Sequence, residues 1–235
     1  MRGIRRTILT FILFGFFNSS AQQVLQVAEK TFEKRIEVGK DDVLEVRSEK
    51  ADVVIISGDI NYISVKIVFT ASHPDKAVAT KELIYQKYAV GRYGKTIMVQ
   101  TSYFLRDVKR VLSRMSAHIE LTIPASMSVT AVGEYTDFTI NDTQGSNNIS
   151  MKFGKLTLKN ISGSTTVNTT YGDIDGEKIS GGLNIVGARS EIVLKVEDPS
   201  IEKEISIIEK QQVLNTPRIK IKNISGTIRF EKAEP

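Results

Sequence analysis

Apolar residues in the second half of the chain recur at a fixed interval of 18 positions. Three sets show it: Phe138, Leu156, Ile174 and Ile192; Ala131, Ile149, Val167 and Ile185; and Ile140, Leu158, Gly176 and Leu194. Within one copy, apolar and polar residues alternate, an extra residue follows at a corner, and the alternation then resumes. Alternation keeps side chains on one face of a strand, and the extra residue marks a bend. The pattern predicts an all-β fold, a single-stranded β-solenoid or β-helix-like stack with coils of about 18 residues.

Each copy carries a similar motif at its corner. The four motifs are Tyr135-Thr136-Asp137-Phe138, Phe153-Gly154-Lys155-Leu156, Tyr171-Gly172-Asp173-Ile174 and Arg189-Ser190-Glu191-Ile192, and Gly145, Gly163 and Gly181 keep the same interval. At about 3.3 Å per residue, one copy spans about 59 Å and can turn once around a flattened coil, about 4.8 Å from the next. A left-handed hexapeptide helix is excluded, because Lys155, Asp173 and Glu191 occupy positions where it requires aliphatic residues.

Before the repeat, shorter alternating segments predict irregular strands and a hairpin. We expect strands over residues 30–38, 43–47, 52–56, 63–69, 83–90, 96–103 and 119–123. Residues 23–35 are also compatible with a short helix, but a strand is the favoured interpretation. Residues 72–80 predict a loop or a single helical turn, and residues 104–116 predict an exposed loop or short helix. Lys50-Ala51-Asp52-Val53 looks like a degenerate copy of the corner motif.

The start of the chain, over residues 1–21, has the pattern of an export signal. Arg2, Arg5 and Arg6 precede an apolar run over residues 7–17, and Ser19-Ser20-Ala21 supplies small residues before a cleavage point. A signal-anchor is the alternative, although the run is about half of the roughly 20 residues that span a membrane. Cleavage leaves residues 22–235 as a single elongated all-β domain, with regular repeats over 127–196 and irregular last coils with a cap over 197–235.

Composition narrows the class of partner. The chain has a net charge of +5, but without Arg2, Arg5 and Arg6 the 32 basic side chains become 29 against 27 acidic ones, a net charge of +2. Bulk charge therefore disfavours nucleic acid as a partner. The chain contains no cysteine, which excludes disulfides, thiolate metal sites and a lipid-anchoring cysteine. Export without disulfides is typical of a bacterial envelope protein or a protein released from a bacterial cell.

No residue set forms a catalytic pattern. His73 and His118 are the only histidines, and neither belongs to a recognisable nucleophile motif. Asp173, Asp175 and Glu177 alternate along one copy and could contribute to a calcium site, but the chain lacks the glycine-rich nonapeptide repeat and the calcium loop that such sites require. A solvated turn is the simpler interpretation. We predict no catalytic residue, no metal site and no cofactor.

Two other sets could bind a ligand. Tyr135, Phe153, Tyr171 and Arg189 share one position of the repeat, so they form either a surface for carbohydrate or aromatic ligands or a stack of rings that packs for structural reasons and ends in a cation–π contact. Arg106, Lys109, Arg110 and Arg114 belong to a predicted basic surface loop that could contact anionic lipid headgroups or an acidic polysaccharide. The alternative is that this loop is only solvated.

Three of these features resemble a known family. The corner Tyr171-Gly172-Asp173-Ile174, the segment Ile179-Ser180-Gly181-Gly182 and the strand that ends in Ile123-Pro124-Ala125 are similar to the bacterial "putative adhesin" family of exported toast-rack β-solenoid domains, over residues 43–196. The corner departs from Gly-Asp in the other three copies. The resemblance implies a non-enzymatic module of the cell envelope or surface.

We therefore expect an exported binding or scaffolding module, adhesin-like, in the periplasm, on the outer-membrane surface or outside the cell. Its partner would be a glycan or an envelope protein, and no segment after the signal is long and apolar enough to span a membrane as a helix. Two alternatives stay open. One is a polysaccharide-active β-helix enzyme, which needs paired carboxylates on one face; the other is an envelope-stress or assembly factor that acts through a protein partner.

Overall fold

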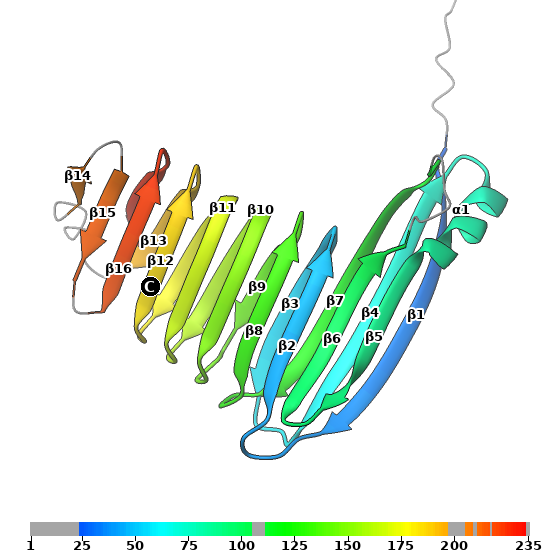
Figure 1. Ribbon diagram of the computed structural model, residues 1–235, viewed down its shortest axis with the longest axis horizontal. Coiled ribbons are helices and arrows are strands. Elements are labelled where there is room, and N and C mark those ends of the chain that lie inside the picture. Colours follow the sequence, from blue (N-terminus) through cyan, green and yellow to red (C-terminus); the bar gives the residue numbers. More distant parts are fainter. Residues whose placement is uncertain (1–23, 105–110, 197–204, 209–210, 217, 234–235) are drawn as a thin grey trace, which may run out of the picture.

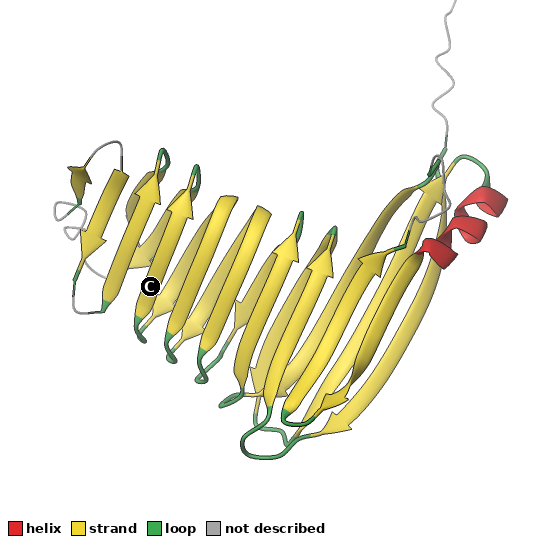
Figure 2. Ribbon diagram, in the orientation of Figure 1, coloured by secondary structure: helices red, strands yellow, loops and turns green. Residues whose placement is uncertain are grey.

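The computed structural model describes residues 24–104, 111–196, 205–208, 211–216 and 218–233. The expected signal peptide lies outside these residues. The fold is all-β, as expected, and Figure 2 shows that helical structure gathers at one end of the molecule. There, α1 (Lys76–Glu82) leads into the short 3-10 helix η1 (Leu83–Tyr85). The chain was expected to form a loop or one helical turn over 72–80, and the helix begins and ends later than that.

Seventeen strands form one continuous curled sheet within the described residues. Before the repeat they are β1 (Gln26–Glu37), β2 (Val43–Glu49), β3 (Ala51–Gly58), β4 (Tyr62–His73), β5 (Gln86–Tyr93), β6 (Thr96–Tyr103) and β7 (Arg114–Pro124). In the repeat they are β8 (Ser128–Glu134), β9 (Asp137–Asn141), β10 (Asn147–Ile161), β11 (Thr165–Ile179), β12 (Leu183–Ala188) and β13 (Glu191–Val196). The last are β14 (Ser206–Ile208), β15 (Gln211–Asn215), β16 (Ile219–Ile224) and β17 (Thr227–Lys232).

The strands pair in two rows that run along the long axis of the molecule (Figure 1). The first row has the order β5-β6-β2-β8-β10-β11-β12-β16-β15-β14. The second row has the order β1-β4-β7-β3-β9-β10-β11-β13-β17. Because β10 and β11 bend at their centres and belong to both rows, the two rows share one interior, where the buried side chains form a single cluster.

The interval of the sequence repeat is also the register of the parallel pairing. Leu156 pairs with Phe138 on one side and with Ile174 on the other, and Ile174 pairs with Ile192. All four side chains are at most 1% exposed, so the predicted column exists and lies in the core. The other two apolar sets stack in the same way. Each fully buried aliphatic side chain stabilises the fold by about 1.5–3 kcal/mol.

The pairing also extends beyond the regular copies. On the C-terminal side, Leu183 pairs with Ile219, which is two intervals away in the sequence, and the residues between them include the antiparallel strands β14 and β15. On the N-terminal side, β2 and β3 pair in parallel with β8 and β9, and Asp52 lies opposite Asp137. The resemblance of residues 50–53 to a corner motif is therefore confirmed.

The corner of each copy is made by a residue in the left-handed conformation. Tyr135, Phe153, Tyr171 and Arg189 have φ values of 53–57°, and Lys50 has a φ of 49° at the equivalent point. This conformation is strained for residues other than glycine. The packing on both sides of the corner must offset that strain in every copy of the repeat. Because this packing recurs with the repeat, the corner interrupts the alternation at the same position in each copy.

The turn that contains Gly145, Gly163 or Gly181 in successive copies requires glycine, because the backbone of each turn lies very close to that of the turn before it. A Cβ atom on Gly163 would lie 1.9 Å from the carbonyl oxygen of Gly145, and one on Gly181 would lie 2.0 Å from the carbonyl oxygen of Gly163. No side chain fits in that space. The glycines that recur with the repeat are therefore required by the stacking of one turn on the next.

The end of the molecule that carries α1 is closed by buried polar contacts. Glu82 is buried and accepts hydrogen bonds from the backbone N–H groups of Leu112 (3.1 Å) and Ser113 (2.7 Å). Burial opposes ionisation of this carboxyl, but the hydrogen bonds from Ser113 and Leu112 outweigh it and lower the pKa of Glu82. Glu82 thus ties the start of β7 to the helix.

Candidate functional site

The outer face of the first row carries lines of small uncharged polar side chains. In the line nearest the start of each strand, Thr130 lies opposite Asn148, Asn148 opposite Thr166, and Thr166 opposite Asn184. Two further lines follow at intervals of two residues, since alternate side chains point to the same face of a strand. One places Ser150 and Asn168 between two valines, and the other places Thr170 beside the charged pair at the margin of the face, Lys152 and Glu134. We call the following residues the uncharged face: Thr130, Asn148, Ser150, Thr166, Asn168, Thr170 and Asn184.

A groove of about 670 Å³ runs across this face. Its walls combine polar residues of the uncharged face with the partly exposed apolar side chains Val132 and Val186. Charged residues lie at its margin, where the Lys152 ammonium is 3.8 Å from the Glu134 carboxylate. The residues that line it include Val132, Ser150, Lys152, Asn168, Thr170 and Val186.

The polar side chains of the uncharged face have no bonding partner in the part of the chain that the structure describes. The side chains of its seven residues form no hydrogen bond or ion pair with any residue that the structure describes. Amides and hydroxyls of this kind can each donate and accept hydrogen bonds. In the free protein they are solvated, and a ligand that replaces this water can bond to several of them at once.

The outer face of the second row differs, because its polar groups bond to one another. The Asp137 carboxylate accepts the backbone N–H of Lys155 (2.7 Å), and Asp173 accepts that of Glu191 in the same way (2.9 Å). The Lys155 ammonium forms an ion pair with Asp175. Its hydrogen bond to Asp175, with smaller effects of Asp173 and Asp137, raises the pKa of Lys155.

This pairing concerns two kinds of site that the sequence analysis considered, a calcium site on β11 and a pair of catalytic carboxylates. Asp175 is bound to Lys155, and the Glu177 carboxylate lies 4.0 Å from the Lys159 ammonium, so lysines of the neighbouring strand neutralise the acidic alternation of β11. No group of three or more potential metal ligands occurs within the described parts of the chain. Of the carboxylates that share a line with Lys155, those of Asp137 and Asp173 accept backbone N–H groups and that of Glu191 pairs with Arg229.

The predicted aromatic set forms a stack. The ring centroids of Tyr135 and Phe153 are 4.8 Å apart with planes at 8°, and those of Phe153 and Tyr171 are 5.1 Å apart with planes at 16°. The Arg189 guanidinium lies 5.1 Å from the centroid of the Tyr171 ring. We call these four residues the ladder. Phe153 lies between the two tyrosine rings, and Arg189 covers the other face of Tyr171. The ladder therefore offers ring edges, hydroxyls, a guanidinium and the outer face of Tyr135 to a ligand.

The ladder borders the groove. Glu134, Lys152 and Thr170, which line the groove, directly precede Tyr135, Phe153 and Tyr171 in the chain. The predicted basic loop is not assembled in the same way. Arg106, Lys109 and Arg110 lie outside the described residues, and Arg114 is the first residue of β7. Arg114 was expected in a loop, but the segment from Arg114 pairs with Ser72 on β4 and continues the second row.

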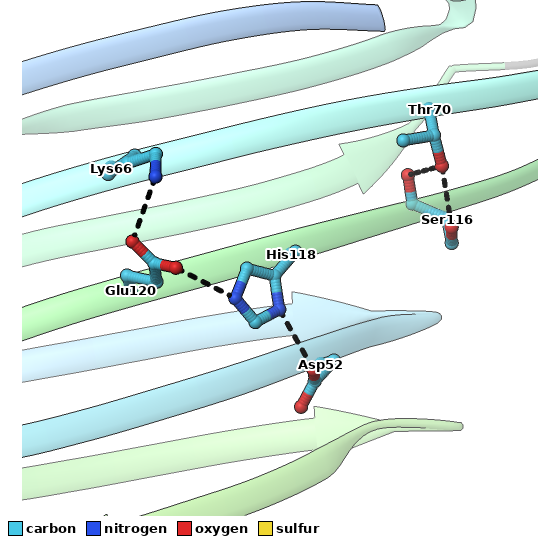
Figure 3. A network of polar contacts seen from close by, with 6 residues as sticks. All are labelled: Asp52, Lys66, Thr70, Ser116, His118 and Glu120. Atoms are coloured by element: carbon cyan, nitrogen blue, oxygen red, sulfur yellow. Dashed lines mark hydrogen bonds and ion pairs between the residues drawn. The ribbon is translucent and has the colours of Figure 1, made fainter. Parts of the chain in front are cut away.

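His118 lies in a network of charged side chains on the second row (Figure 3). Its Nδ1 atom is 2.8 Å from the Asp52 carboxylate, its Nε2 atom is 3.2 Å from Glu120, and Glu120 also pairs with Lys66 at 3.1 Å. Both ring nitrogens therefore contact carboxylates. The Ser116 hydroxyl bonds to Thr70 at 2.7 Å instead, so His118 activates no nucleophile in this arrangement.

His73 has a local structural role. Its Nδ1 atom lies 3.0 Å from the backbone nitrogen of Asp75, and the Asp75 carboxylate caps the first turn of α1 by accepting the N–H of Ala77 at 2.8 Å. The two histidines therefore have different structural roles. His73 shapes the turn before α1, and His118 contacts carboxylates on the sheet.

Comparison with known proteins identifies similar solved structures but no sequence family. No family model and no curated protein matches the chain. The chain is similar to a "putative cell adhesion protein" from Clostridium sporogenes, with 11% identity, a TM-score of 0.44, and coverage of 88% of this chain and 100% of the other. It is also similar to a "putative adhesin" from Bacteroides fragilis (12% identity, TM-score 0.25, coverage 86% and 97%) and to one from Parabacteroides distasonis (12%, 0.26, 86% and 95%).

These names agree with the bacterial "putative adhesin" family that the corner motif resembles. Within the described residues, no helix has the length and apolar character needed to cross a membrane.

Sequence reasoning missed the uncharged face, although a signal for it was present. The alignment of the repeat copies that reveals the apolar columns also places Thr130, Asn148, Thr166 and Asn184 in one line. What the alignment does not contain is the bonding state of each polar group. That depends on the neighbouring strand, and it distinguishes this line from the equally polar lines of the second row.

Proposed function

We propose that this protein is a non-enzymatic, adhesin-like binding module of the bacterial cell envelope or surface, and that the groove on its uncharged face binds an uncharged glycan. The observation that carries the proposal is the set of seven side chains with free amide and hydroxyl groups in one register on one face. Glycan hydroxyls are both donors and acceptors, and they match such groups without needing a charge partner.

The spacing of the face favours an extended ligand. Successive strands lie about 4.8 Å apart, so a chain of sugars lying across the strands meets a new set of side chains at each one. A single uncharged hydrogen bond contributes only about 0.5–1.5 kcal/mol, so affinity requires several in parallel. Val132 and Val186, which are partly exposed in the groove, provide apolar surface for the carbon-bearing faces of the sugar rings.

The ladder would form one margin of this site. The ring faces of Phe153 and Tyr171 are covered, so we assign these two rings no sugar stacking. Tyr135 and Tyr171 are 52% and 42% exposed, and their hydroxyls together with the Arg189 guanidinium can donate hydrogen bonds to a ligand that lies in the groove. This assignment retains Tyr135, Phe153, Tyr171 and Arg189 as site residues and makes Phe153 the one that only supports its neighbours.

The scaffold we propose is a β-solenoid. Parallel pairing shifted by one copy of the repeat supports it through the regular copies, and the shared interior of the two rows supports a single domain over residues 22–235. We assign residues 1–21 to a cleaved signal peptide, which places the protein in the periplasm, on the outer-membrane surface or outside the cell. The engaged carboxylates of the second row favour binding over glycan hydrolysis.

A glycan array with residues 22–235 tests the proposal, with Asn168→Asp as the informative variant. We expect binding to uncharged glycans, and we expect Asn168→Asp to weaken it about tenfold, because the new carboxylate cannot donate a hydrogen bond and must be desolvated. The matched control is Asn141→Asp, the same change on the outer face of the second row, where Lys159 lies on the neighbouring strand. Binding should then be unchanged.

Binding only to acidic glycans, or equal losses in the two variants, would overturn the proposal. Recovery of a single envelope protein from extracts, in the absence of glycan binding, would instead support the assembly-factor alternative. Release of reducing sugars from a bound polysaccharide would support the enzyme alternative.

A further inference from the structure

Exposed apolar side chains gather at the end of the molecule that carries α1. They come from the start of β1, from η1, from the end of β6 and from the residues before β7, and each is between 48% and 74% exposed. We call the following residues the apolar end: Val24, Leu25, Val27, Ile84, Phe104 and Leu112. Scattered exposed apolar residues are normal on a protein surface, but a group at one end indicates an interaction site.

Backbone contacts hold these segments together. The N–H of Phe104 donates to the carbonyl of Tyr85 at 2.8 Å, beside Ile84. The N–H of Leu112 donates to the Glu82 carboxylate at 3.1 Å. Val27 pairs with Ser72, and Ser72 pairs with Arg114 on the next strand. The four segments are thus anchored to the same helix and strand ends, at the end of the long axis where α1 lies (Figure 1).

The charged side chains at this end are mostly basic. Lys76, Lys81, Lys87 and Arg114 are exposed and form no ion pair with the residues that the structure describes. The two acidic groups on or beside the helix are already used, since Asp75 caps α1 and Glu82 is buried under Leu112 and Ser113. Glu29 on β1 is an exposed acidic side chain at the same end.

We propose that the apolar end docks onto a membrane surface that contains anionic lipid. Apolar side chains ringed by free cations match the boundary between acyl chains and negatively charged headgroups. The exposed cations at this end support this partner through charge complementarity, because Lys76, Lys81, Lys87 and Arg114 form no ion pair with the residues that the structure describes.

Docking in this way would orient the molecule. The strands of the uncharged face follow one another along the long axis, away from α1 (Figure 1). A protein held by the apolar end would therefore project the regular copies outward from the lipid surface. This inference is independent of the glycan proposal, because the two surfaces share no residue.

Flotation of residues 22–235 with lipid vesicles tests the inference. We expect the protein to float with vesicles that contain phosphatidylglycerol and to stay behind with phosphatidylcholine alone. The triple variant Ile84→Ser/Phe104→Ser/Leu112→Ser should lower the bound fraction about tenfold. The control Ile56→Ser/Tyr93→Ser removes exposed apolar side chains that belong neither to the apolar end nor to the groove, and it should bind the vesicles as the parent does.

A charge-reversal pair gives a second test that does not depend on apolar substitutions. Lys76 and Lys81 are exposed on α1, so Lys76→Glu/Lys81→Glu should fold normally and lose about tenfold in binding to phosphatidylglycerol vesicles. The inference is overturned if both vesicle types bind equally, if the apolar control loses as much as the triple variant, or if the apolar end instead joins two copies into a dimer in sedimentation experiments without lipid.

Discussion

The two outer faces of the repeat are built in the same register, yet they treat their polar groups in opposite ways. On the second row, Asp137 and Asp173 bond to backbone amides of the next coil, and Lys155 pairs with Asp175. On the first row, the side chains of the seven residues of the uncharged face bond to no described residue, and Lys152 and Glu134 form an ion pair at its margin. The second row therefore uses its polar side chains to join neighbouring copies of the repeat, while the uncharged face leaves its polar side chains available.

This contrast indicates a division of labour within each coil. Ion pairs on a solvated surface contribute about 0–1 kcal/mol each, so the second row gains modest stability and a fixed order of coils. A face without charges gains no such stability, but it also avoids the cost of stripping water from ions when a ligand binds. A surface for an uncharged ligand is therefore best built from side chains without charge, such as those of the uncharged face.

The largest expected effect concerns the interior that both faces share. Ile174 is fully buried between Leu156 and Ile192. Replacing it with Asp places an unpaired carboxylate in the core, at a cost of several kcal/mol against a total stability of about 5–15 kcal/mol. We expect Ile174→Asp to abolish the cooperative thermal transition measured by circular dichroism.

The neighbouring control for this variant is Asp173→Asn, which keeps an oxygen that can accept the N–H of Glu191. It should melt within a few degrees of the parent. An unchanged melting temperature for Ile174→Asp would mean that the two rows do not share a packed interior.

The next largest effect on stability concerns the turn that connects the two rows. A Cβ atom on Gly181 would lie 2.0 Å from the carbonyl oxygen of Gly163, whereas one on Gly182 would meet nothing within 4 Å. Gly181→Ala should therefore destabilise the fold by about 3 kcal/mol. Gly182→Ala should be neutral or slightly stabilising, because alanine restricts the unfolded chain. Chemical denaturation of both variants measures the difference, and similar midpoints would contradict the stacking of the turns.

The apolar columns and the glycine column were predictable from the sequence because each obeys a single local rule. A buried strand position must be aliphatic, and a turn that meets another backbone must be glycine, so both rules recur in every copy of the repeat. The strands over residues 43–69 followed from alternation in the same way. The hairpin before Tyr103 was also expected, but residues 83–85, which were predicted as strand, form η1, and β5 begins at Gln86. The helix α1 was only partly foreseen, because its seven residues are too few to show a helical period.

The pairing of the N-terminal half was not predictable from local patterns. β2 pairs in parallel with β6 and β8, and β3 pairs in parallel with β7 and β9. These contacts join segments that are distant in the sequence and have no common interval, so no periodic signal marks them. The candidate site depends on the same kind of information, since the sequence marks Asn168 and Asp173 as exposed polar positions but does not show that Asp173 accepts an N–H group of the adjacent strand while the Asn168 side chain bonds to no described residue.

A smaller effect compares two lysines of β10, one on each face. Lys155 pairs with Asp175, and Lys152 lies 3.8 Å from Glu134 and is 54% exposed in its side chain. Lys155→Met should lower the free energy of unfolding by about 0.5–1 kcal/mol, and Lys152→Met should lower it by less. The reason is that Lys155→Met removes the cation that faces Asp175, Asp173 and Asp137. Raising the salt concentration should reduce the difference.

The pH dependence of this pair has a definite sign. Because folding raises the pKa of Lys155, its ion pair contributes stability fully below the ordinary lysine pKa of about 10.4, and that contribution is lost as the pH rises through the folded-state value. The gap between Lys155→Met and the parent should therefore close in strongly alkaline buffer. A gap that stays constant would show that packing, and not charge, causes the loss.

The last effect concerns the two roles of the ladder, ring packing and contact with a ligand. Tyr171→Phe keeps the ring that stacks on Phe153 and carries Arg189, and it removes only the hydroxyl at the margin of the groove. The melting temperature should be unchanged, while glycan affinity should fall several-fold, in line with the loss of one hydrogen bond of about 1 kcal/mol. Phe153→Tyr is the reciprocal change, because it adds a hydroxyl in the same line. If neither change alters the glycan affinity, the ladder serves packing alone and the ligand contacts only the uncharged face.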